Sequence, residues 1–125
     1  TPNWSASVFL KHSKQDGARA GFTYAVNIVE KRRYSYSLTS EGYVVVSEPL
    51  DDGVRSILGK NVSNILMDEG NELALKYRNG FFYCFVNGYF VGAHQSYENG
   101  GAGSVGVTAS GSGEASFSRF QVFIN

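Results

Sequence analysis

The acidic residues of this sequence are the first candidates for chemistry, because two carboxylates can act together as acid and base or as acid and nucleophile. Glu69 and Glu72 stand three residues apart, where a predicted turn leads into a predicted strand. Asp51 and Asp52 lie in a second predicted turn, between a proline and a glycine. Because turns favour aspartate for backbone reasons, we interpret both pairs as solvated loop carboxylates.

The two histidines and the single cysteine offer no better site. His12 or His94 can be combined on paper with a serine and an aspartate, but no nucleophile elbow accompanies them. The sequence also lacks the spacing of a zinc site and the loop pattern of an EF-hand. Cys84 has no second cysteine to pair with and is expected to be a small buried side chain. We therefore predict a protein that is not an enzyme and needs no cofactor.

One set of residues does share a chemistry. Sugars present apolar C–H patches and many hydroxyls, so a sugar site combines exposed aromatic rings with a few hydrogen-bonding or charged side chains. Side chains of this kind gather in one stretch and are the candidate ligand-binding residues: Lys76, Arg78, Phe81, Tyr83, Phe85, Phe90 and His94. Whether they form one surface depends on the strands that carry them.

Two Asn-Gly pairs, Asn79-Gly80 and Asn87-Gly88, divide this stretch into strands. Asn-Gly favours the two-residue turn with positive φ at both positions, whose twist matches that of the strands it joins. Since residues of high strand propensity flank both pairs, positions 71–93 are predicted to form a three-stranded meander.

The register of this meander follows by counting from the two turns. Leu75 is predicted to pair with Cys84, Cys84 with Val91, and Phe82 with Ala93. Because side chains alternate across a sheet, the core face is predicted to carry Leu73, Leu75, Tyr77, Phe82, Cys84, Val86, Tyr89, Val91 and Ala93. All seven candidate ligand-binding residues then lie on the opposite face.

An alternative is that another part of the chain covers this opposite face, such as an N-terminal strand or the loop 51–68. Soluble domains rarely leave such a large apolar patch open. In that case a binding surface would have to lie in the loops, around residues 11–16, 51–52 and 96–101.

The rest of the chain also alternates with the period of strands. Strands are predicted at residues 5–10, 22–30, 34–39, 43–46, 104–109 and 115–124, with shorter pieces around Ile57, Val62, Ile65 and Leu66. The basic run 31–33 is predicted to make a turn and to be a solvated hairpin tip, although three cations in a row also suggest an anion site. No segment shows a sustained helical period.

About nine or ten antiparallel strands cannot form one open sheet without leaving an apolar face bare. We therefore predict an all-β fold, an antiparallel two-sheet β-sandwich that forms a single domain over residues 1–125. Fifteen glycines and only two prolines agree with short strands joined by turns. Because the sequence starts at Thr1 without methionine or a signal segment, we expect an excised domain of a larger, multidomain protein or a processed product.

Three C-terminal segments carry a pattern of a known family: NELALKYRNGFFYCFVNG, GSVGVTA and EASFSRFQVF. They resemble the ending of concanavalin A-like lectin/glucanase domains, which include laminin-G-like domains. The segment GFTYAVNIVEKRRYSYSLTSEGYVVV looks like the paired strands of the same family, so the resemblance extends from Trp4 to the end. It implies a concanavalin A-like jelly roll.

The resemblance also bears on catalysis and on metals. Catalytic members carry a Glu-x-Asp-x-x-Glu pattern on one strand, which this sequence lacks, so a jelly-roll glycoside hydrolase is disfavoured. Laminin-G-like domains often hold one calcium ion, for which Asp51, Asp52 or Asp68 are candidates. Since a jelly roll can be held by its core alone, we expect no required metal.

We therefore expect a non-catalytic carbohydrate-binding, lectin-like module of an extracytoplasmic protein, whether extracellular, periplasmic or at the cell surface. The alternative is a laminin-G-like protein-interaction or adhesive domain with a protein ligand. Eleven basic and eleven acidic residues give a formal net charge of zero, which favours neither nucleic acid nor an anionic membrane. No apolar run is long enough for membrane insertion.

Overall fold

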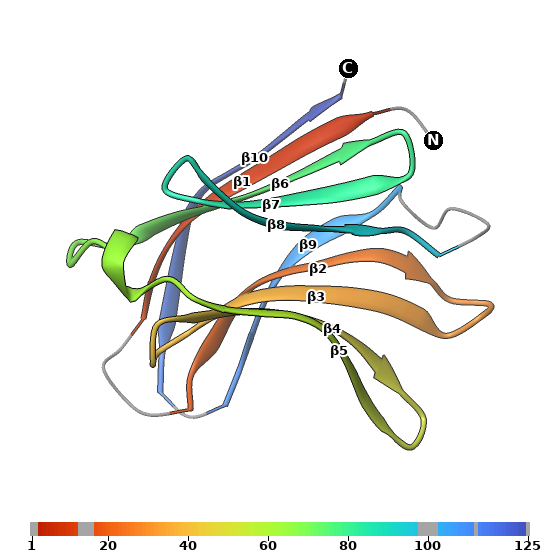
Figure 1. Ribbon diagram of the computed structural model, residues 1–125, viewed down its shortest axis with the longest axis horizontal. Coiled ribbons are helices and arrows are strands. Elements are labelled where there is room, and N and C mark those ends of the chain that lie inside the picture. Colours follow the sequence, from red (N-terminus) through yellow and green to blue (C-terminus); the bar gives the residue numbers. More distant parts are fainter. Residues whose placement is uncertain (1–2, 13–16, 98–102, 112, 125) are drawn as a thin grey trace.

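Two five-stranded antiparallel sheets pack face to face in the computed structural model, which describes residues 3–12, 17–97, 103–111 and 113–124 (Figure 1). In order across the sheet, sheet A contains β10 (Ala115–Ile124), β1 (Trp4–His12), β6 (Asn71–Arg78), β7 (Phe81–Val86) and β8 (Tyr89–Gln95). Sheet B contains β5 (Gly53–Asn61), β4 (Tyr43–Leu50), β3 (Arg32–Thr39), β2 (Arg19–Asn27) and β9 (Val105–Ser110). The predicted all-β, two-sheet antiparallel sandwich is confirmed.

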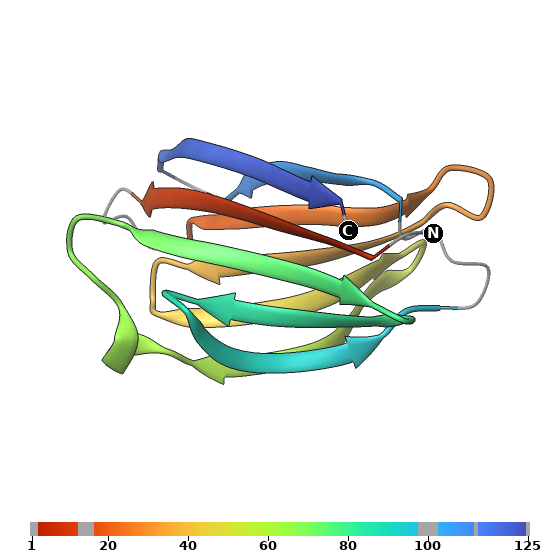
Figure 2. The same cartoon turned by 90° about the horizontal axis from the view of Figure 1, so that it is seen from above.

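Strand geometry explains the layers. Side chains alternate across each strand, so every second residue points into the space between the sheets, as the alternating burial along β1 and β6 shows. Viewed from above, the strands of sheet A lie roughly along those of sheet B (Figure 2). The helical element in the described residues is the short 3-10 turn η1 (Ser63–Ile65), and no described helix is long and apolar enough to cross a membrane.

The core is aromatic and centred on Phe82. Its ring lies with centroids 4.7 Å from Tyr24, 6.0 Å from Tyr34, 5.1 Å from Tyr77 and 6.1 Å from Trp4. Because these rings come from four strands besides β7, their packing joins the two sheets.

Both Asn-Gly hairpins form as predicted. The φ angles are 49° at Asn79 and 89° at Gly80, and 50° at Asn87 and 83° at Gly88. Between β6 and β7 the predicted register holds, with Leu75 opposite Cys84.

Between β7 and β8 the predicted register is wrong beyond the turn. A β-bulge lies between the Phe85–Phe90 pair and the Cys84–Gly92 pair. On the side away from the turn the pairing is therefore shifted by one residue, so that Phe82 faces His94. Because one extra residue exchanges the two faces of a strand, His94 turns inward and Ala93 becomes exposed.

The bulge has a packing reason. A Cβ atom at Gly92 would lie 2.5 Å from Cδ2 of Leu58, at the place where β5 of the other sheet approaches β8. Glycine at this position therefore lets Leu58 pack against β8 without a shift of the leucine side chain. Tyr89, which was also predicted to be in the core, is 61% exposed beside the turn.

Two other local predictions are corrected. The basic run does not make a turn by itself, because only Lys31 lies in the turn, at a φ of 55°, while Arg32 and Arg33 begin β3. The strand predicted at 43–46 continues to Leu50. Of the uncertain pieces after it, Ile57 lies in β5 and Ile65 in η1, while Val62 and Leu66 flank η1. The alternation of apolar and polar residues therefore predicted where strands lie better than where they begin and end.

The core register can be tested at Leu75, which is fully buried between Ala6 and Cys84. We expect Leu75→Ala to lower the free energy of unfolding by about 2–5 kcal/mol, because it leaves a cavity in a packed core. Urea unfolding measures this value. The exposed neighbour Glu72→Ala is the control and should change it by less than about 0.5 kcal/mol. Equal effects of the two substitutions would contradict the register.

Asn79 and Asn87 occupy equivalent positions in the two turns, so substitutions at these positions can be compared. The side chain of Asn87 accepts a hydrogen bond from the Glu72 amide at 2.9 Å and donates to the Ile65 carbonyl at 2.8 Å and to Asn71 Oδ1 at 2.9 Å. Glycine fits both turns, so Asn87→Gly removes these bonds without straining the backbone and should cost about 1–3 kcal/mol.

Asn79→Gly is the control for this measurement. The described structure gives the Asn79 side chain no such bonds, since only its backbone amide is engaged, with Asn3 Oδ1. We expect thermal or urea unfolding to show a change of a few tenths of a kcal/mol for this variant. If Asn87→Gly were as mild, the asparagine network would not stabilise the fold.

Candidate functional site

Six of the seven predicted ligand-binding residues share the outer face of sheet A. Lys76 lies opposite Tyr83, Arg78 opposite Phe81, and Phe85 opposite Phe90. Directly opposite residues point to the same side of a sheet. We call this surface the aromatic face, and it consists of Lys76, Arg78, Phe81, Tyr83, Phe85 and Phe90.

The aromatic face is open. Phe90 is 55% exposed and Phe81 42% exposed, while Tyr83 and Phe85 are half-buried. The alternative that an N-terminal strand or the segment after Asp51 covers it is wrong for the described residues. β1 lies beside β6 within the same sheet, and β5 belongs to sheet B.

Three of its rings are contiguous. The Phe90 ring lies 5.7 Å from Phe85 in an edge-on arrangement and 6.4 Å from Tyr83, measured between centroids. The ammonium of Lys76 lies 5.0 Å from the Phe85 centroid, within the range of a cation–π contact. Arg78 is held at the end of the face, because its Nη1 donates to the carbonyls of Trp4 and Tyr77.

His94 does not belong to this face, which corrects the prediction. It is 8% exposed and stacks on Phe82 between the sheets. Its Nδ1 lies 3.1 Å from the Gln95 carbonyl and its Nε2 lies 2.7 Å from the Tyr24 hydroxyl. A neutral ring therefore donates at Nδ1 and accepts the Tyr24 proton at Nε2. Burial lowers the pKa of His94, so the ring stays neutral and serves the core.

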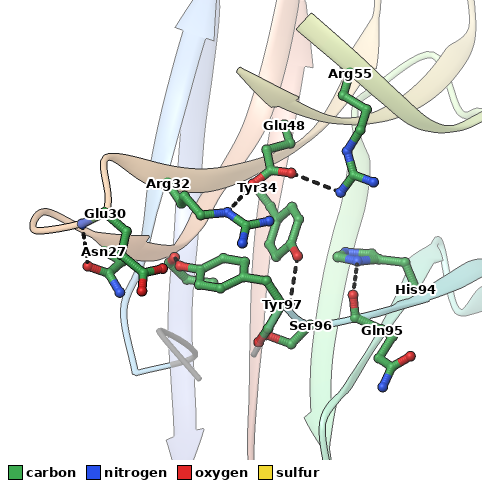
Figure 3. A network of polar contacts seen from close by, with 11 residues as sticks. Asn27, Glu30, Arg32, Tyr34, Glu48, Arg55, His94, Gln95, Ser96 and Tyr97 are labelled. Atoms are coloured by element: carbon green, nitrogen blue, oxygen red, sulfur yellow. Dashed lines mark hydrogen bonds and ion pairs between the residues drawn. The ribbon is translucent and has the colours of Figure 1, made fainter. Parts of the chain in front are cut away.

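A polar network that the sequence analysis missed occupies one end of the sandwich (Figure 3). The Glu48 carboxylate is 1% exposed and accepts from Arg32 Nε at 2.7 Å and from Arg55 Nη2 at 2.8 Å. The hydrogen bond from Arg32, together with that from Arg55, lowers the pKa of Glu48 despite its burial. A signal was present in the sequence, since Glu48 continues the inward alternation of Val44 and Val46.

Two hollows lie near this network. The larger, of about 450 Å³, is formed by the β2–β3 and β4–β5 hairpins and is lined in part by Lys31, Arg32 and Arg33. The smaller, of about 250 Å³, is a groove along the outer face of sheet B, lined mainly by hydroxyl side chains such as Ser35, Ser47 and Thr108. The sequence predicted neither hollow, although the basic run 31–33 that lines the larger one had suggested an anion site.

The described residues offer no acid–base or metal centre. Glu48 is their one buried carboxylate, and two guanidinium groups hold it ionised. Asp51 and Asp52 lie in the β4–β5 turn and Asp68 follows η1, at opposite ends of the sandwich (Figure 1). No group of three His, Cys, Asp or Glu side chains that could hold a metal ion forms in this part of the chain. Burial raises the pKa of the Cys84 thiol to about 12, which makes it inert as a nucleophile.

Comparisons with known proteins show what has the same fold. No protein-family model matches this chain, and no curated protein sequence matches it. The carbohydrate-binding module CBM66 from Bacillus subtilis superposes with a TM-score of 0.77 over 98% of this chain and 76% of that chain, at 13% identity. Sheep galectin-11 in complex with glycerol gives 0.74 over 98% of this chain and 91% of that chain, at 9% identity.

A third similar structure is much longer. The GH43 BlXynB protein from Bacillus licheniformis gives a TM-score of 0.70 at 19% identity, and this chain covers only 28% of it. At these identities the likeness concerns the fold alone. It confirms the β-sandwich jelly-roll fold that the sequence motifs indicated.

The buried histidine generates a prediction about pH. Because the folded-state pKa of His94 is lowered, the unfolded chain binds a proton more readily, and stability should fall as the pH drops from about 7 to about 5. We expect His94→Gln, whose amide can still meet the Tyr24 hydroxyl, to flatten this decline. Urea unfolding at several pH values measures it.

Part of the decline will remain in that variant, because burial also lowers the pKa of His12. The lowered pKa of Glu48 acts at more acidic pH, below the ordinary carboxyl range, and does not interfere. An identical pH slope in His94→Gln and the parent protein would contradict the assignment of His94 as a neutral core residue.

Proposed function

We propose that this chain is a non-catalytic carbohydrate-binding, lectin-like module of an extracytoplasmic protein, and that a glycan lies on the aromatic face. The observation that carries the proposal is the open group of contiguous rings formed by Tyr83, Phe85 and Phe90, with a lysine beside it. Exposed apolar patches on a soluble domain usually mark a binding surface.

The chemistry of this surface suits a sugar. Aromatic rings offer flat apolar surfaces to the C–H groups of a pyranose, and they lose little conformational entropy on binding. The Tyr83 hydroxyl and the Lys76 ammonium, which lie in directly opposite positions, supply donors for sugar hydroxyls. The fold is shared with a carbohydrate-binding module and with a galectin, which supports the same ligand class here.

Three further parts of the proposal have their own support. A non-catalytic role agrees with the ion pairs that compensate the charge of Glu48 and with the separation of Asp51 and Asp52 from Asp68. The GH43 protein shows that this fold also occurs within longer chains. A place within a longer, multidomain protein agrees with the 28% of the GH43 chain that this fold occupies. The extracytoplasmic location is part of the proposal and rests on the proposed ligand class alone.

A second candidate is a laminin-G-like protein-interaction or adhesive domain that uses the same face. It is favoured by the predominance of phenylalanine, which has no polar group for sugar hydroxyls. Aromatic residues are also enriched at protein interfaces. The two candidates therefore differ in the ligand and share the surface.

A glycan array followed by calorimetric titration of the best glycan tests the proposal. We expect Phe90→Ala to weaken binding by about 0.5–1.5 kcal/mol beyond the loss of contact area, with little change in thermal stability. Tyr83→Ala should act in the same direction. Tyr89→Ala is the matched control, because Tyr89 is equally exposed but lies opposite the inward-facing Val86, away from this face.

Three results would count against this proposal. Equal weakening by Tyr89→Ala would remove the site from the aromatic face. A large fall in the thermal stability of Tyr83→Ala would show that this ring is structural. If no glycan on the array bound, and the parent protein captured a polypeptide partner that the Phe90→Ala variant did not capture, the ligand would be a protein and not a glycan.

A further inference from the structure

The larger hollow has an excess of positive charge. Lys31, Arg32 and Arg33 line it, and the one carboxylate among its lining residues is Asp51, which makes no ion pair with them in the described structure. Among the described residues only Arg32 of these three cations has an ion-pair partner, which is Glu48. The like charges repel one another in a concave surface, and a bound anion relieves this repulsion. The basic run is therefore more than the solvated hairpin tip that the sequence predicted.

The Arg32 guanidinium is held in a fixed orientation by two neighbours. Its Nε donates to the buried Glu48, and its guanidinium lies 4.1 Å from the centroid of the Tyr97 ring (Figure 3). Tyr97 is fixed in turn, since its amide donates to the Tyr34 hydroxyl at 2.9 Å and its own hydroxyl donates to the Ala25 carbonyl.

The other two nitrogens of Arg32 remain available. Within the described residues, Nη1 and Nη2 have no hydrogen-bond acceptor. A planar guanidinium fork suits a carboxylate or a sulfate, and a fork that is already oriented loses less entropy on binding. Glu48 itself is compensated by Arg55, so the pair of arginines around it retains one net positive charge.

One part of the wall of the hollow is apolar. Val26, Ile28 and Leu50 line it and are 40%, 85% and 49% exposed, and Pro49 adjoins them. Apolar walls beside a cationic wall match a sugar ring that bears an acidic group, because the ring presents C–H patches and the acid presents charge.

We propose that this hollow is a second binding site and that it takes an acidic sugar residue, recognised through its carboxylate or sulfate. The proposal rests on the proposed carbohydrate-binding function, but it concerns a different surface from the aromatic face. It gives the basic run, the buried Glu48 and the Tyr97 stack one common role.

The neighbouring groove extends the site. Arg33 and Pro49 line both the hollow and the groove on the outer face of sheet B, so the two adjoin. Hydroxyl groups of Ser35, Ser47 and Thr108 line the groove and can bond to the hydroxyls of further sugar units. The ligand is therefore an oligosaccharide with its acidic unit in the hollow.

Calorimetric titration with two pairs of probes tests this site. The first pair is an oligogalacturonide and its fully methyl-esterified form, and the second is a sulfated galactan oligosaccharide and its desulfated form. We expect at least one acidic probe to bind more tightly than its neutral form, with an affinity that falls as salt is added. The pair that responds shows whether carboxylate or sulfate is recognised.

Arg33→Gln is the diagnostic variant, because Arg33 is exposed and its loss leaves the Glu48 pairs intact. We expect it to weaken the acidic probe about tenfold, as for one charge-assisted hydrogen bond. Lys60→Gln removes a cation that is also exposed, from β5 and outside both hollows, and should have no effect. Nitrogen-15 shifts of arginine Nε signals on titration report contact at Arg32 independently.

Each other result overturns the inference. Equal binding of acidic and neutral probes, equal weakening by Lys60→Gln, or no binding and no arginine shift with either acid would each remove the acidic-sugar site. The proposed function fails separately, because its readout is the effect of Phe90→Ala on a glycan bound at the aromatic face. Loss of acidic binding in Phe90→Ala with none in Arg33→Gln would place the acidic glycan on the aromatic face instead.

Discussion

The hydroxyl groups of three buried tyrosines constrain the whole sandwich. Tyr24, Tyr34 and Tyr36 point from sheet B into the core and are at most 1% exposed. An unpaired buried hydroxyl costs about 1–3 kcal/mol, so each needs a partner between the sheets. The partners are the His94 ring, the Tyr97 amide and the Phe85 carbonyl, which all belong to β7, β8 or the residues just after β8. Sheet B is thereby fixed against one edge of sheet A.

The bulge in β8 follows from this constraint. It turns His94 inward to meet Tyr24 and places Gly92 where Leu58 of the opposite sheet needs room. Without the extra residue, the histidine would face solvent and the Tyr24 hydroxyl would lose its partner. Because the bulge lies after Phe90 in β8, the pairing of Phe85 with Phe90 is kept and the rings of the aromatic face stay together.

The two proposed surfaces are built in different ways. The aromatic face is a product of strand alternation, since its rings lie on the outside of regular strands and contact one another across the ladder. The hollow at the hairpin end depends on a buried ion network, in which one carboxylate orients two arginines. A buried ion pair contributes little to stability on average but fixes geometry, which is what a site for a charged group requires.

Local patterns in the sequence determined the fold class, both Asn-Gly hairpins, the β6–β7 register and six residues of the aromatic face. Each of these depends only on alternation and on turn chemistry, which neighbouring residues specify. The inward turn of His94, the partners of Glu48 and the openness of the aromatic face were decided by tertiary structure. They depend on which strands of the opposite sheet approach β8 and β4, and on what the rest of the chain leaves uncovered. Contacts between segments as distant as Tyr24 and His94 form only when the two sheets pack, so no local pattern can specify them.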